Sequence, residues 1–177
     1  NIISKCDGYI QAIEYHQILG TAIQFDGLII MQRRAGEFIV SGTPIAVLYN
    51  NSGIPSSISL DSALVIGQER TSLQDTLYAI NQLVEMALRA LSPSMNDPFT
   101  AINCIDRLAS GLASFTEENL PKTSIVDADN ELRMITNEAT FHDLFKGAFN
   151  QIRQNSVDQT FVVIHLLDTF ITLLKAC

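Results

Sequence analysis

The chain has 177 residues, of which 47% are hydrophobic, and it carries a formal net charge of −8 with a pI near 4.7. A chain of this length and composition can bury a substantial core, which excludes intrinsic disorder as its general state. The eleven Lys and Arg residues are scattered along an acidic chain. Binding a phosphate backbone requires clustered basic residues, so we expect no nucleic-acid partner.

The apolar runs of the sequence are short, as at Leu28–Met31 and Phe161–Ile164. A helix that crosses a bilayer needs about 20 predominantly apolar residues. The sequence therefore predicts no membrane-spanning segment within these residues. Because the chain begins at Asn1 without an initiator Met or a signal peptide, we expect it to be a piece of a longer protein.

Cysteine and histidine positions give no sign of a disulfide framework or of a metal or cofactor site. The three cysteines are odd in number and widely spaced, which favours a reducing compartment. The histidines lie far apart and lack metal-ligand spacing. His165, within an apolar helical pattern, is predicted to be a core or interface residue. The residues concerned are Cys6, Cys104, Cys177, His16, His142 and His165.

The first fifty residues predict a compact β-rich unit with one helix. Apolar alternation and β-forming residues indicate strands, and Tyr15 to Ile23 shows helical spacing. Asn50–Ser57 is rich in turn-forming residues and marks a loop. The predicted strands are 8–13, 28–33, 38–40 and 44–48.

Beyond the loop the pattern becomes mainly helical, with a short helix expected at Ser59–Ile66. A longer helix is predicted over about 73–91, with Ser72 and Asp75 as a capping box. Asn96 or Asp97 caps the next helix, which has Pro98 in its first turn. A hairpin is predicted near 124–135. The sequence thus predicts an α+β fold with a β-rich subdomain, residues 1–50, packed on a mainly helical subdomain, residues 51–177.

Two further helices are expected to finish the chain. Thr140 and Asp143 form a capping box for the first, and Ser156 and Gln159 are expected to cap the second. The last helix is apolar over most of its circumference. Such a helix is either central in the core or shared with a partner, and a homo-oligomer is therefore an expected partner state.

Polar side chains gather between the two long central helices, in the loop Ser92–Asp97. They are candidates for a ligand-binding pocket beside the free N–H groups of a helix N-terminus. The alternative is a tight connector whose residues fix the turn and cap the helix. A second polar cluster precedes the first of these helices. The candidate ligand-binding residues are Arg70, Thr71, Asp75, Ser92, Ser94, Asn96, Asp97 and Thr100.

Several segments occur in an order that is similar to a known family. They include Gly8–Ile13, Gly36–Ile45, Ile66–Thr71, Ala87–Ala101 and Phe149–Gln154. Together they resemble the bacterial predicted membrane proteins of the domain of unknown function 2254 family, over essentially the whole chain.

The resemblance implies a parent protein of the inner membrane, in which a multi-pass part precedes this domain and is its partner. It implies no activity, catalytic residue or cofactor. We expect a soluble regulatory, ligand-sensing or assembly domain, with a small-molecule ligand as a further candidate partner. Unpaired cysteines favour the cytoplasmic side. The alternative is an enzyme that acts on a small or membrane-derived substrate through the Ser92–Asp97 loop.

Overall fold

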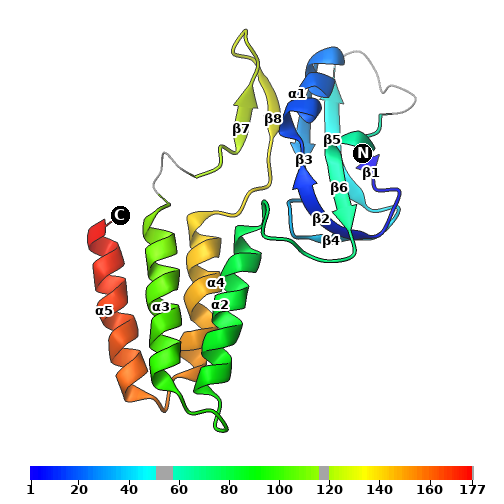
Figure 1. Cartoon of the computed structure of the whole chain (residues 1–177). Coiled ribbons are helices and arrows are strands. Elements are labelled where there is room, and N and C mark those ends of the chain that lie inside the picture. The colour runs from blue at the N-terminus through cyan, green and yellow to red at the C-terminus, as the bar shows by residue number, and fades with distance from the viewer. Residues whose placement is uncertain (51–57, 116–119, 177) are drawn as a thin grey trace. The chain divides into compact units, whose positions relative to one another are not determined.

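The computed structural model describes residues 1–50, 58–115 and 120–176, which fall into two compact units (Figure 1). Unit 1 consists of Asn1–Asp75 and Pro121–Glu138, and unit 2 of Thr76–Leu120 and Ala139–Cys177. The first is β-rich and the second helical, so the predicted α+β class is confirmed.

Within its described residues, unit 1 holds two sheets and one α-helix. The larger sheet has the strand order β1-β5-β3-β8-β7, and the smaller has the order β4-β2-β6. All strand pairs are antiparallel except β3 with β8. The elements are β1 (Ile2–Ile3), β2 (Gly8–Ile13), α1 (Tyr15–Gln24), β3 (Gly27–Met31), β4 (Phe38–Ile39), β5 (Pro44–Asn50), a 3-10 turn (Asp61–Ala63), β6 (Leu64–Gly67), β7 (Ser124–Val126) and β8 (Leu132–Ile135).

The core of unit 1 follows from the alternation of its strands. In β3 every second side chain is buried, among them Ile29 and Met31. Helix α1 contributes Ile18 and Ala22 to the same core. The period of two in the strands and the helical spacing in α1 bring apolar faces together, as the sequence predicts.

Residues 59–66 do not form the predicted short helix. Asp61–Ala63 makes one 3-10 turn, and β6 then pairs with β2, with Ile13 opposite Leu64 and Ile10 opposite Ile66. The apolar residues of this segment fit a strand because β2 offers it a ladder of hydrogen bonds. A partner so distant in sequence overrides the local helical preference.

The division into units also differs from the expected boundary near residue 50. Strand β6 and the hairpin β7–β8 lie in unit 1, because β6 pairs with β2 and β8 pairs with β3 in parallel, with Ile29 opposite Met134. The hairpin itself is confirmed at the predicted residues. The predicted loop 51–57 lies outside the described residues.

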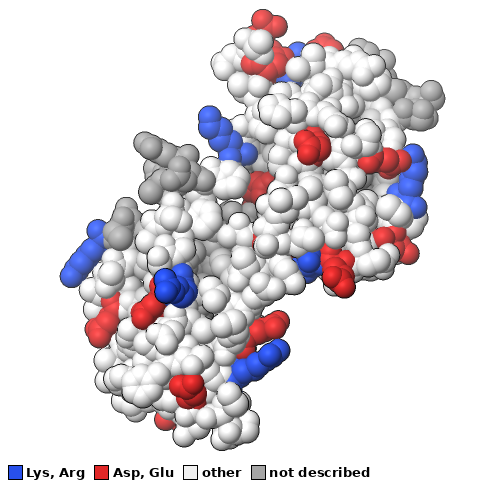
Figure 2. Space-filling view, viewed as in Figure 1, with Lys and Arg blue, Asp and Glu red and all other residues white. Residues whose placement is uncertain are grey.

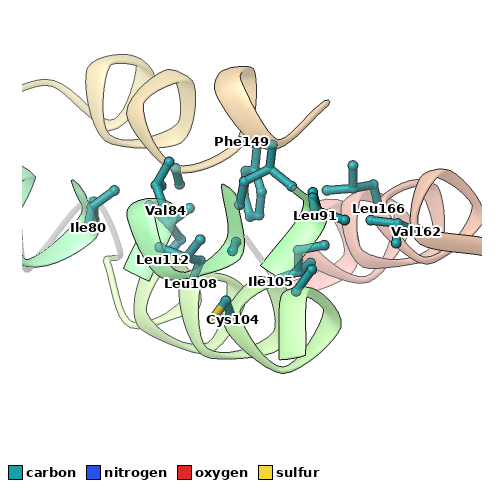
Figure 3. Packing of buried hydrophobic residues seen from close by; sticks show 14 of the residues in the cluster. Ile80, Val84, Leu91, Cys104, Ile105, Leu108, Leu112, Phe149, Val162 and Leu166 are labelled. Carbon is teal, nitrogen blue, oxygen red and sulfur yellow. The ribbon is translucent and has the colours of Figure 1, made fainter. Parts of the chain in front are cut away.

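The described residues of unit 2 form four helices. Figure 1 shows them side by side, with α3 between α5 and the pair α2 and α4; α2 packs against both α3 and α4, and α5 packs against α3. Their buried side chains form one core, seen from close by in Figure 3. The helices are α2 (Thr76–Leu91), α3 (Pro98–Ala113), α4 (Phe141–Asn155) and α5 (Thr160–Ala176).

Helix ends in unit 2 follow the predicted chemistry in part. The capping box of Thr140 and Asp143 is present, and Pro98 follows the N-cap Asp97. Ser156 does not cap α5: its hydroxyl donates to the carbonyl of Arg153 in the preceding helix. Likewise α2 begins only at Thr76, so Asp75 directly precedes it instead of standing within its first turn.

Candidate functional site

Arg70 and Asp75 form an ion pair in unit 1. Nε and Nη2 of Arg70 donate to Oδ2 of Asp75 at 2.9 and 2.6 Å. The Asp75 side chain is only 4% exposed and that of Arg70 is 28% exposed. A buried carboxylate is tolerated when charged donors compensate its desolvation. The sequence prediction that these two residues cluster is therefore confirmed by their contact, although a ligand there stays a prediction.

A glycine turn packs directly on this carboxylate. Gly36 is the third residue of a turn closed by the Glu37 N–H and the Arg34 carbonyl, and its φ is +86°. A Cβ atom at Gly36 would stand 1.9 Å from Oδ2 of Asp75. Glycine is therefore required both by the backbone conformation and by the close approach.

Thr71 lies next to the ion pair in the chain and has a buried hydroxyl. Its Oγ1 makes no hydrogen bond within the part of the chain that the structure describes. A buried hydroxyl in this state is costly, and water or a ligand ordinarily satisfies it. Thr71 is accordingly the member of the first cluster that a further polar partner would stabilise.

The Ser92–Asp97 loop joins α2 to α3 and is closed by its own hydrogen bonds. Backbone N–H groups of Asn96 and Asp97 donate to the carbonyls of Ser92 and Ala90, each at 2.8 Å. Asn96 has a φ of +45°, a left-handed conformation that Asn tolerates better than most residues. Asp97 is the N-cap of α3 and accepts from the N–H and the hydroxyl of Thr100, at 3.1 and 2.6 Å.

The remaining polar side chains of this loop also bond within unit 2. The hydroxyl of Ser92 donates to the Arg89 carbonyl at 2.6 Å and lies 3.1 Å from that of Ser94. Oδ1 of Asn96 accepts from Gln159 at 3.3 Å. These contacts favour the connector interpretation over the pocket, because the side chains already serve to cap and to hold the turn.

The two predicted clusters stand at opposite ends of α2. Residues 70–75 precede the helix and Ser92 follows it, and its 16 residues span about 24 Å at 1.5 Å per residue. The length of α2 thus separates the two sets along the chain, and a ligand at either set stays a prediction.

Asp97 gives a testable pH dependence. The hydroxyl and N–H of Thr100 hold the pKa of Asp97 below its ordinary value of 3.8. Because the folded pKa is the lower one, the stabilisation is present above pH 3.8 and is lost as the pH falls below it. We expect Asp97→Ala to lower the thermal unfolding midpoint at pH 7 and to flatten its decline in acid, as measured by circular dichroism from pH 7 to pH 3. A decline as steep as in the unaltered chain would contradict this role.

The outer face of α5 carries apolar side chains that unit 2 leaves exposed. Its inner face, with Val162, Leu166 and Leu173, is buried in the core. On the outer side, apolar residues recur at intervals of three and four and are between 51% and 82% exposed. We call them the α5 stripe: Ile164, Leu167, Ile171 and Leu174.

Aromatic residues extend this stripe at its N-terminal end. The rings of Phe99 and Phe161 meet edge to face with their centroids 5.9 Å apart, although both side chains are more than half exposed. Val157 and Met95 are exposed as well. Exposed apolar side chains that recur along one face of a helix mark an interaction site more often than single surface residues do.

A groove of about 340 Å³ lies between α3 and α5, and His165 contributes to it. Nε2 of His165 lies 2.7 Å from Oδ1 of Asp106, and Ser110 and Asp168 also line the groove. The pair fixes the imidazole and links the two helices. His165 is partly exposed and paired with Asp106, so it is not a fully buried core residue, and its place at an interface between subunits stays a prediction. The Asp106 partner has no signal in the sequence because 59 residues separate the two.

Other site chemistry is sparse in the described ranges. No three His, Cys, Asp or Glu side chains there are placed to hold a metal ion. The described helices include none with the length and hydropathy that a bilayer crossing requires. On the face shown in Figure 2, the Lys and Arg side chains of the described residues form no continuous basic surface.

Comparison with known proteins places the chain among uncharacterised relatives. It is 26% identical to the uncharacterized protein Rv1290c of Mycobacterium tuberculosis over 184 residues, and equally to the uncharacterized protein Mb1321c of Mycobacterium bovis. Each alignment covers 99% of this chain but 35% of the relative, so the chain spans about a third of their length. No solved structure matches it significantly. The family described as predicted membrane protein (DUF2254) matches residues 1–172, and the chain therefore belongs to that family.

Proposed function

We propose that this chain is the extramembrane assembly domain of a multi-pass membrane protein, and that it joins two copies of the protein through α5. The α5 stripe is the observation that carries the proposal. In a parallel arrangement of two helices, Ile at position a and Leu at position d of a heptad favour a two-stranded coil. In the heptads of α5, Ile164 and Ile171 occupy position a, and Leu167 and Leu174 occupy position d.

The extent of the apolar surface supports a second copy as its occupant. The α5 stripe and its extension comprise eight large apolar side chains, each more than half exposed. At roughly 100 Å² for each, they would bury on the order of 800 Å² per partner, the size of a standard specific interface. A surface that contacts itself by two-fold symmetry needs no other partner to become complete.

The family supports the membrane context of this proposal. Its members are described as predicted membrane proteins, and the described helices of this chain include no candidate span. The parts of the relatives outside the matched region would then hold the spans. Cys6 is exposed and unpaired, which favours the cytoplasmic side for this domain. The Ser92–Asp97 loop gives the catalytic alternative no specific support, since its polar groups cap and close the connector.

Sedimentation equilibrium of the 177-residue chain tests the pairing. We expect a dimer at micromolar concentration, and we expect Ile164→Glu with Ile171→Glu to weaken dimerisation by at least about 100-fold, because each protomer would bury two unpaired carboxylates. Circular dichroism should show that the variant keeps its helices, since both positions are exposed in the single chain.

Leu73→Glu with Met86→Glu is the matched control. Both residues are exposed and apolar but lie outside the α5 stripe, so the same added charge should leave the dimer intact. A chain that stays monomeric at about 200 µM, well above the micromolar range of specific dimers, would refute the proposal. Another part of the longer protein would then cover the α5 stripe.

A further inference from the structure

A second groove, of about 380 Å³, lies between α4 and α5 and has an aromatic floor. Phe145, Phe149 and Phe170 meet there, with ring centroids 5.1 to 5.3 Å apart. Phe149 is buried, while Phe145 and Phe170 are half-buried and line the opening. The floor therefore offers ring faces and edges to an apolar group.

The rim of this groove is basic and comes from one face of α4. His142, Lys146, Asn150 and Arg153 line it, at helical intervals of four, four and three residues. Lys146 and Arg153 are two turns apart, or about 10 Å along the axis at 1.5 Å per residue. Both side chains are long enough to converge on one group placed above Asn150.

The rim is notable in a chain of net charge −8. No acidic side chain lines this groove within the described residues. Over the same ranges, Lys146 and Arg153 have no ion-pair partner, in contrast to Arg33, Arg70 and Arg133. The groove thus combines uncompensated positive charge with an aromatic surface, a combination suited to a ligand with an anionic head and an apolar tail.

We propose that this groove binds an anionic amphiphile. Lys146 and Arg153 hold its phosphate or carboxylate group, the amide of Asn150 donates a hydrogen bond to it, and the apolar tail lies over Phe145 and Phe170. This inference is independent of the pairing through α5, because it rests on the face of α5 that meets α4 and not on the α5 stripe.

Isothermal titration calorimetry with octyl phosphate, below its micellar concentration, tests the site on the full chain. We expect saturable binding, and at least about tenfold weaker binding of both inorganic phosphate and octyl glucoside, which each lack one half of the ligand chemistry. Equal affinity for octyl phosphate and either of these probes would overturn the proposal, as would the absence of saturable binding.

Charge-neutralising variants locate the site. Lys146→Gln with Arg153→Gln should weaken octyl phosphate binding at least about tenfold while the unfolding midpoint changes little, because both side chains are exposed. Arg89→Gln with Lys175→Gln removes the same charge outside the groove and should bind as the unaltered chain does. If both double variants weaken octyl phosphate binding equally, the attraction is non-specific and the proposed site is refuted.

Two further measurements show where the apolar tail binds and which kind of molecule supplies the ligand. The variant Ile164→Glu with Ile171→Glu should retain octyl phosphate binding. If this variant loses binding, the tail lies on the α5 stripe and the proposed groove site is wrong.

Co-sedimentation with phosphatidylglycerol vesicles that is lost in the Lys146→Gln, Arg153→Gln variant would identify a bilayer lipid as the source of the ligand. Binding of octyl phosphate without vesicle binding would identify a free amphiphile, and either source supports the same chemistry.

Discussion

Replacing Gly36 by alanine is expected to destabilise unit 1 by about 4 kcal/mol, because it acts on a buried charge as well as on the backbone. The φ of Gly36 is +86°, and a new Cβ would stand 1.9 Å from Oδ2 of Asp75. Either the turn or the carboxylate must move. If the carboxylate moves, it leaves its bonds with Arg70 while remaining in a buried environment.

Gly42 provides the matched control for this substitution. Its φ is +84°, yet no atom lies within 4 Å of the position that a Cβ would take. Gly42→Ala should therefore cost only the backbone strain, about 1 kcal/mol. Urea unfolding monitored by circular dichroism measures both variants. Similar losses for Gly36→Ala and Gly42→Ala would show that the contact with Asp75 contributes nothing.

A double-mutant cycle separates the clash from the strain. In an Asp75→Ala background the Gly36→Ala substitution no longer meets a carboxylate, so its cost should fall to that of Gly42→Ala. Additive losses would contradict the close approach that the structure shows. The cycle thus tests a contact between residues that are 39 positions apart in the chain.

Elements whose determinants are local could be predicted from the sequence. The capping box of Thr140 and Asp143 and the N-cap Asp97 before Pro98 involve residues within one turn, and both occur as expected. The β7–β8 hairpin is equally local. The helix that the sequence predicts at residues 59–66 is wrong, because β6 is set by pairing with β2, whose residues lie more than 50 positions earlier.

The same limit applies to the candidate sites. Arg70 and Asp75 are five residues apart and were expected to cluster, whereas the packing of Gly36 on Asp75 has no local signature. The sequence of α5 predicts a helix that is apolar over most of its circumference, but it does not show which face α3 covers. The basic rim on α4 could have been found, since Lys146, Asn150 and Arg153 keep helical spacing, although its aromatic floor needs Phe170 from α5.

Phe149→Ala is expected to cost unit 2 about 3 to 5 kcal/mol, the range for truncating a buried aromatic side chain. The Phe149 side chain is 2% exposed, and its ring lies 5.1 Å from those of both Phe145 and Phe170. Alanine would leave a cavity between α4 and α5 and remove two edge-to-face contacts. Loss of helical circular dichroism at 222 nm in urea measures the effect.

Phe141→Ala tests whether the stability lost in Phe149→Ala comes from the burial of the Phe149 ring in the core. Phe141 is half-buried, and its ring contacts that of Phe145 at a centroid distance of 6.4 Å. Its truncation should cost about 1 to 2 kcal/mol, because neighbouring water and side chains can fill the space. If Phe149→Ala costs no more than this, the helices must close around the deleted ring. In that case α4 and α5 are not held apart by a rigid aromatic cluster, and the groove above it would have no fixed floor.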